Sequence, residues 1–170
     1  MPVAVTTARD AENLDRAGGR RLRLLLDSAS TEGRMSVMEC ELPAEAAGPP
    51  LHVHPQTDET FLVHEGTLLL HVAGVTHRLR GGDSAFVPRG TPHTFASADE
   101  PVRFGCVLTP GGFEGMHRDV RRGEEAAGRP FSPAEIVPIA ARYDWQLAGP
   151  PLLPTGQLAD AGRPAGAPQP

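Results

Sequence analysis

The chain has 170 residues, 39% of them hydrophobic, and a formal net charge of −5. This length suits a single domain with short flanking segments. All sixteen basic residues are arginines and no long basic run occurs, which argues against nucleic-acid binding. No segment approaches the roughly 20 apolar residues that span a bilayer, and residues 1–19 lack the apolar core of a signal peptide. We therefore expect a cytoplasmic protein without membrane contacts.

Short strands separated by glycine and proline turns dominate the first two thirds of the chain. Residues 1–19 are polar and end in glycine, which predicts a flexible arm. Alternating or short apolar segments then predict nine or so strands. These are residues 20–28, 35–42, 51–54, 59–64, 67–72, 75–79, 84–87, 91–96 and 102–108. Strands of this length and spacing over residues 20–109 are typical of an all-β sandwich or barrel.

The pattern changes after residue 109, and residues 110–148 are predicted to form a helical extension. Apolar residues at helical spacing predict one helix over residues 113–122. A second helix over 133–143 starts with Ser132 as the N-cap, Pro133 in the first turn and Glu135 three residues after the cap. From Gly149 to the end, proline and glycine crowd a segment without apolar periodicity, which predicts a disordered tail.

The two cysteines, Cys40 and Cys106, each lie inside an apolar, strand-like run. Free cysteine is among the most buried residue types, so two buried free thiols are the simplest interpretation. A disulfide and a cysteine metal ligand are the alternatives.

Three histidines and one glutamate have the spacing of a metal site. His52 and His54 are two residues apart, so on an extended strand they point to the same face. A short turn led by proline then brings Glu59 back on the next strand, and His93 follows a Pro-x-Gly turn at 88–90. Imidazoles with one carboxylate suit a first-row transition metal.

These residues make the chain resemble the cupin superfamily. The first cupin motif, G-x5-H-x-H-x3,4-E-x6-G, corresponds here to His52, His54, Glu59 and Gly66. The second, G-x5-P-x-G-x2-H-x3-N, corresponds to Gly82, Pro88, Gly90 and His93. Two positions depart from the motifs, because Gly48 stands closer to His52 than the motif requires and Ser97 replaces the asparagine.

The resemblance implies a fold and a ligand set. The fold is a cupin jelly-roll barrel, or double-stranded β-helix, followed here by two short C-terminal helices. The ligands are His52, His54, Glu59 and His93, holding one divalent transition metal: iron, manganese, nickel, cobalt, copper or zinc. Cupins commonly dimerise, and the apolar outward residues Leu62 and Leu69 are compatible with a homodimer.

Strand parity predicts the neighbours of the metal. Phe61 and Val63 share the face of Glu59, and Phe95 shares that of His93. Apolar neighbours would exclude water and raise the basicity of Glu59 by desolvation. His71 is a further pocket candidate, although its strand is apolar on both faces.

The ligand set leaves the reaction open. A metal with free coordination positions can act as a Lewis acid or bind oxygen, and a carboxylate beside it can act as a general base. The resemblance favours a quercetinase-like dioxygenase that uses molecular oxygen on an enol-bearing aromatic or polyketide-type small molecule, with Glu59 as the catalytic residue. A redox-neutral polyketide cyclase or isomerase and a non-catalytic small-molecule binding cupin are the alternatives.

Overall fold

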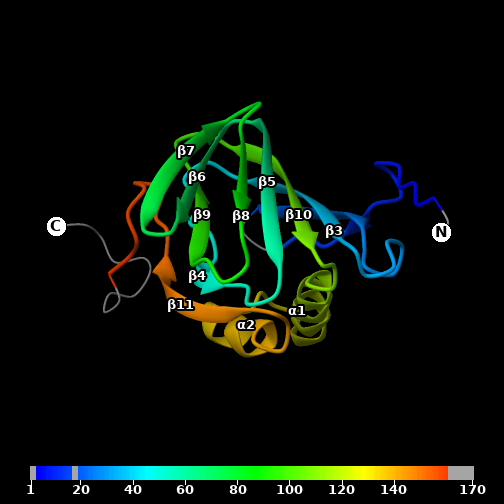
Figure 1. Ribbon diagram of the computed structural model, residues 1–170. Helices are drawn as coiled ribbons and strands as arrows, with labels where there is room; N and C mark the ends of the chain where they lie inside the picture. Colours follow the sequence, from blue (N-terminus) through cyan, green and yellow to red (C-terminus); the bar gives the residue numbers. More distant parts are fainter. Residues whose placement is uncertain (1–2, 17–18, 161–170) are drawn as a thin grey trace.

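The protein is mostly β structure with two helices at one end, as the computed structural model shows for residues 3–16 and 19–160 (Figure 1). The strands are β1 (Glu12–Asn13), β2 (Arg21–Leu26), β3 (Ser36–Leu42), β4 (Pro50–Val53), β5 (Asp58–Glu65), β6 (Thr67–Val72), β7 (Val75–Arg80), β8 (Ser84–Val87), β9 (His93–Ser97), β10 (Val102–Thr109) and β11 (Gln146–Pro151). The helices are α1 (Glu114–Ala127) and α2 (Pro133–Ala140).

Two antiparallel sheets face each other and enclose the core. The larger sheet has the order β1-β2-β3-β10-β5-β8, and the smaller has the order β11-β4-β9-β6-β7. Alternate residues of each strand point inward, so both sheets contribute to one apolar cluster. Its buried members are Leu42, Phe61, Val63, Leu68, Leu70, Val87, Val102 and Phe104. The predicted all-β jelly-roll fold with two C-terminal helices is confirmed.

Strand β6 is apolar on both faces, and its surroundings decide which residues point inward. Leu68 and Leu70 belong to the central cluster, which places Leu69 and His71 on the outer face. Leu69 is 1% exposed because Leu152 packs over it. The prediction that Leu69 contributes to a dimer contact is therefore wrong, because residues of the same chain already cover this side chain.

Both flanking segments are more ordered than their composition predicts. Strand β1 pairs with β2, and Leu14 beside it is 1% exposed within an apolar cluster. The prediction of a disordered tail is wrong for residues 149–160, because β11 pairs with β4 and Leu152 is fully buried. Prolines are tolerated in β11 because it is an edge strand, where an unpaired position needs no N–H. The rest of the predicted tail, residues 161–170, lies outside the described residues.

The helices pack together against one end of the barrel (Figure 1). Met116 and Val120 of α1 meet Ala140 and Trp145 in a separate apolar cluster. The predicted start of α2 is confirmed, because Ser132 and Glu135 form a capping box. Helix α1 runs five residues beyond its predicted end, to Ala127. Neither described helix is long and apolar enough to cross a membrane.

The structure explains the residues found at two motif positions, Gly66 and Ser97. Gly66 has φ of 75°, and a Cβ there would lie 2.0 Å from the carbonyl oxygen of Pro101, so only glycine fits. Ser97, in place of the motif asparagine, is fully buried and donates a 2.6 Å hydrogen bond to the carbonyl of Pro43. It also accepts one from the backbone N–H of Ala46, so this serine fastens the loop before β4 to β9.

Candidate metal centre

Four potential ligands converge inside the barrel from three strands. His52 lies on β4, directly opposite His93 on β9, and His54 follows the end of β4. Glu59 lies near the start of β5. One ligand-type atom from each of the four lies within 4.8 Å of the others, and the four residues are only 1–6% exposed. The structure therefore brings together the complete set of residues that the sequence motifs predicted.

Each of the three imidazoles is oriented by a backbone carbonyl. When Nδ1 carries the proton and donates it to such an oxygen, the electron pair of Nε2 is free to bind a metal. The Nδ1–O distances are 2.8 Å for His52 to Pro50, 2.5 Å for His54 to Asp144, and 2.9 Å for His93 to Thr91. The same arrangement on all three histidines is typical of ligands whose tautomer is fixed by their surroundings.

The carboxylate of Glu59 is held on both oxygens. Its Oε2 lies 2.8 Å from Nε2 of His93 and 3.6 Å from Nε2 of His54. Its Oε1 accepts a hydrogen bond from the thiol of Cys106 at 2.8 Å. Both cysteines are free thiols, and Cys106 is buried.

Burial alone would raise the pKa of Glu59, which is the effect predicted from its apolar neighbours. The hydrogen bond from His93 and the electrostatic interactions with His93 and His54 outweigh burial and lower this pKa to about 2. The expected gain in basicity by desolvation is therefore wrong for this arrangement. Glu59 is ionised throughout the neutral range, which is the form that binds a metal.

His52 and His93, which lie opposite each other on β4 and β9, differ in their protonation. Burial and the neighbouring His93 and His54 lower the pKa of His52 to about 3, so this imidazole is neutral at pH 7. Burial opposes a charge on His93 as well, but the hydrogen bond to Glu59 outweighs it and raises the pKa of His93. A metal that binds Nε2 of His93 has to displace the proton shared with Glu59, so binding releases a proton.

Aromatic side chains from outside the barrel cover the cluster. The indole of Trp145 stacks on His52 with ring centroids 5.4 Å apart and an interplanar angle of 21°. The ring of Phe113 meets His54 edge-on at 4.6 Å. Trp145 and the carbonyl of Asp144 were not predicted from the sequence. The signal that could have found them is weak: Trp145 is the chain's single tryptophan, placed just before the supposed tail.

Three of the four predicted pocket residues lie in the barrel interior, and His71 does not. Phe61 and Val63 are buried in the core, and the ring of Phe61 lies 6.3 Å from that of His93 and 5.7 Å from that of Phe95. Phe61, Val63 and Phe95 line the barrel interior next to the cluster. The pocket role predicted for His71 is wrong, because this residue lies on the outer face of β6, where its Nδ1 lies 2.8 Å from the hydroxyl of Thr76.

The donor set fits a divalent transition metal. Three imidazole nitrogens and one carboxylate are ligands that iron, manganese, cobalt, nickel, copper and zinc all accept. Four protein ligands leave one or two positions open on a five- or six-coordinate ion, and an open position is a mark of catalytic rather than structural sites. His52, His54, Glu59 and His93 would be the ligands.

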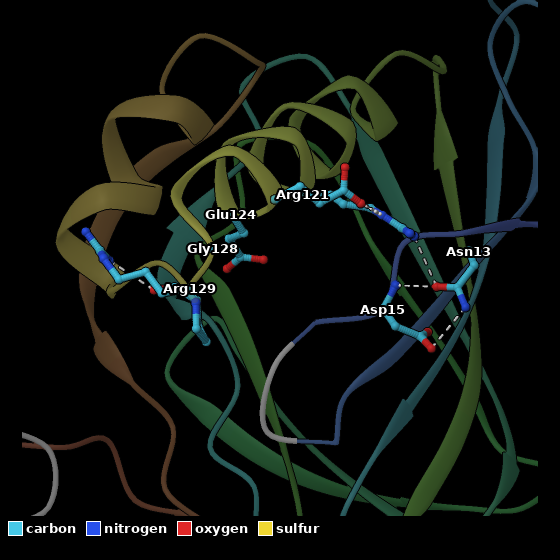
Figure 2. Close-up of a pocket in the computed structure, with 8 residues that line it drawn as sticks. Asn13, Asp15, Arg121, Glu124, Gly128 and Arg129 are labelled. Carbon is cyan, nitrogen blue, oxygen red and sulfur yellow. Dashed lines mark hydrogen bonds and ion pairs between the residues drawn. The ribbon is translucent and has the colours of Figure 1, made fainter.

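A separate surface cleft lies between α1 and the segment around β1 (Figure 2). Its volume is about 500 Å³. Its arginines are already paired: Arg121 donates to Asn13 and Glu125, and Arg129 donates to Glu135. The residues that line this cleft include none of the four members of the metal-type cluster.

Two facing antiparallel sheets around a buried three-histidine, one-glutamate cluster define a double-stranded β-helix with a candidate metal centre. Residues 38–109 match the family model described as the cupin domain, which confirms the resemblance seen in the motifs. A quercetin 2,3-dioxygenase of Bacillus subtilis is 33% identical over 92 residues. This match covers 54% of the chain and 25% of that enzyme, so the chain matches only a quarter of the length of that curated relative.

Solved structures share the fold. KdgF from Halomonas sp. has a TM-score of 0.59 and 17% identity, over 67% of this chain and 99% of that one. The polyketide cyclase RemF from Streptomyces resistomycificus has a TM-score of 0.54 and 25% identity, over 64% of this chain and 80% of that one. The related cupins thus include enzymes of different reaction types.

Proposed function

We propose that the protein is a metal-dependent enzyme whose ion is held by His52, His54, Glu59 and His93. The observation that carries this proposal is the geometry of the cluster. Four ligand-type atoms lie within 4.8 Å of one another in the barrel interior. Bringing such groups out of water costs free energy, and a bound cation would return it through coordination.

The reaction that we favour is dioxygenation of an enol-bearing aromatic or polyketide-type small molecule. The 33% identity to a quercetin 2,3-dioxygenase over 92 residues supports this choice. The metal, when bound, would supply Lewis-acid and oxygen chemistry. Both atoms of O₂ would enter the organic product, so no separate reductant is needed.

The residues of the chain would position the substrate and move its proton. Glu59 is ionised and would receive the proton of the substrate hydroxyl on an oxygen directed at the cluster. Phe61 and Phe95 would keep water away from the reacting atoms. Phe113 and Trp145 lie between the cluster and the helices, so a substrate would enter by displacing this aromatic cover.

The second candidate is a redox-neutral cyclase or isomerase, for which the similarity to the polyketide cyclase RemF is the supporting observation. The ligand set serves both reactions, because a Lewis acid can organise a poly-carbonyl chain as well as an aromatic enol. Oxygen consumption separates the two. A binding cupin without turnover is the third outcome, and the conversion of any candidate substrate would exclude it.

The experiment is elemental analysis of purified wild-type protein and of His54→Ala, followed by oxygen uptake with quercetin. We expect near-stoichiometric metal in the wild type and a loss of metal affinity of about 100-fold or more in the variant, since changes beside a ligand alone cost 10–100-fold. Glu59→Gln should reduce turnover more than it reduces metal content. Zinc without oxygen uptake would favour the cyclase, and metal-free wild type after reconstitution would refute the metal centre.

A homodimer is a further part of the proposal. Leu62 and Phe86 lie on the outer face of the larger sheet and are 41% and 62% exposed. Apolar side chains of this size on a sheet face are compatible with contact to a second copy. Light scattering that gives a monomer mass would refute it. The cytoplasmic location expected from the sequence stays a prediction.

A further inference from the structure

Helix α1 presents one histidine to the barrel that no proposed ligand role uses. His117 lies one turn after Phe113 and one turn before Val120. Phe113 contacts the ring of His54, and Val120 is fully buried, so this side of α1 faces the barrel. His117 therefore projects from the surface of α1 that covers the metal centre, and not from the solvent side of the helix.

A single aromatic ring separates His117 from a proposed metal ligand. The ring of Phe113 lies edge-on to His54 at 4.6 Å and edge-on to His117 at 5.6 Å. His117 is not among the four residues whose ligand atoms lie within 4.8 Å of one another. His117 thus lies next to the residues that surround the metal centre and outside the set of proposed ligands.

The Nδ1 atom of His117 is buried and has no hydrogen-bond partner among residues 3–16 and 19–160. It is the one buried side-chain nitrogen or oxygen in that part of the chain with this property. Leaving such an atom unpaired costs free energy, and native structures rarely accept it without a reason. The Nδ1 atoms of the three proposed ligands, in contrast, each lie within hydrogen-bonding distance of a backbone carbonyl.

The electrostatic surroundings keep this imidazole neutral. Burial, followed by the charge of Arg16, lowers the pKa of His117 to about 4, although Glu59 and Glu114 oppose the shift. A neutral imidazole offers one donor and one acceptor nitrogen. It therefore suits an uncharged oxygen group, such as a hydroxyl or a carbonyl, better than a carboxylate or a phosphate.

We propose that Nδ1 of His117 hydrogen-bonds a hydroxyl or carbonyl oxygen of the small molecule that binds the metal centre. This inference rests on the proposed function and adds to it a feature of the substrate. The substrate would carry one oxygen for the metal and a second, uncharged oxygen on the side that faces α1. Polyhydroxylated aromatics and polyketide-type molecules have such oxygens in several positions.

The test is the binding of quercetin to metal-loaded protein under anaerobic conditions, followed by the change in its absorption. His117→Phe keeps a ring of similar shape but removes the nitrogens, and His117→Gln keeps a donor and an acceptor. We expect His117→Phe to hold as much metal as the wild type and to bind quercetin about tenfold more weakly. His117→Gln should recover most of the affinity. His77→Phe, at an exposed position of β7, is the matched control and should bind like the wild type.

The outcomes separate this inference from the proposed function. Equal quercetin affinity in the wild type and His117→Phe, with equal metal content, would overturn the role of His117 alone. Failure of His117→Gln to recover binding would also count against it, because a hydrogen bond and not ring shape is the claim. If the metal-loaded wild type does not bind quercetin, the proposed substrate class fails and the inference fails with it.

Discussion

Among residues 3–16 and 19–160, two glutamates are buried, and their hydrogen-bond partners differ. Glu59 lies in the barrel interior and Glu114 lies in the first turn of α1, with exposed fractions of 6% and 1%. The pKa of each would rise through burial alone, and in each case hydrogen bonds outweigh burial and lower it. Burial and the direction of the pKa shift therefore do not tell the two sites apart.

The partners of the two carboxylates make the difference. Glu114 accepts hydrogen bonds from the N–H and the hydroxyl of Ser28, from the hydroxyl of Ser36 and from the N–H of Gly112. These donors bind metals weakly, and their number satisfies the carboxylate completely. Glu59 contacts two imidazoles and a thiol, which are metal-binding groups. A buried carboxylate indicates a functional site when its partners could themselves be ligands.

The largest expected effect is a difference in unfolding free energy between variants of Glu114 and of Glu59. Glu114→Ala leaves the donors of Ser28, Ser36 and Gly112 without an acceptor, and should lower the free energy of unfolding by about 3 kcal/mol. Glu59→Gln should cost no more than about 1 kcal/mol, because His93 can lose its proton and stay buried as a neutral ring. Urea unfolding in the presence of a chelator measures both. Glu114→Gln, which keeps an acceptor oxygen, is the control and should lose less than Glu114→Ala. Similar losses in Glu59→Gln and Glu114→Ala would break the comparison.

A smaller effect should come from the thiol beside Glu59. Cys106→Ala removes the donor to Oε1, and the carboxylate loses part of its fixed orientation. Metal affinity should fall about tenfold, the lower end of what changes beside a ligand produce. Competition with a chromogenic chelator measures it. Cys106→Ser should restore most of the affinity, whereas Cys40→Ala, the matched change at the other cysteine, should leave it within about twofold of the wild type. Unchanged affinity in Cys106→Ala would show that Glu59 is held without the thiol.

The smallest effect is a dependence on pH. The pKa of Glu114 is lowered in the folded protein, so its contribution to stability is complete above the unfolded carboxyl value of about 4.3. That contribution is lost as pH falls through the folded pKa. The difference in unfolding free energy between wild type and Glu114→Gln should therefore shrink between pH 7 and pH 3. Denaturation at both pH values with a chelator present measures it, and a constant difference would contradict the lowered pKa.

Local residue patterns were sufficient to predict most strands and the candidate ligand set. His52 and His54 share a face because the side chains of any strand alternate, and the turns that return Glu59 and His93 are built from proline and glycine. The capping box of α2 was predictable for the same reason, since Ser132 and Glu135 interact across three residues. Such features depend on neighbours in the sequence.

Only the tertiary structure decided the features that depend on distant contacts. The sequence could not show which face of β6 points inward, because Leu68, Leu69 and Leu70 are all apolar. Leu69 points outward and is covered by Leu152, which lies more than 80 residues later in the sequence. Likewise, Trp145 and the carbonyl of Asp144 reach His52 and His54 across about 90 residues. Composition predicted a disordered segment from residue 149 onward, but β11 pairs with β4 and Leu152 is fully buried. The local sequence determines which side chains alternate along a strand, whereas tertiary packing determines which residues cover each face.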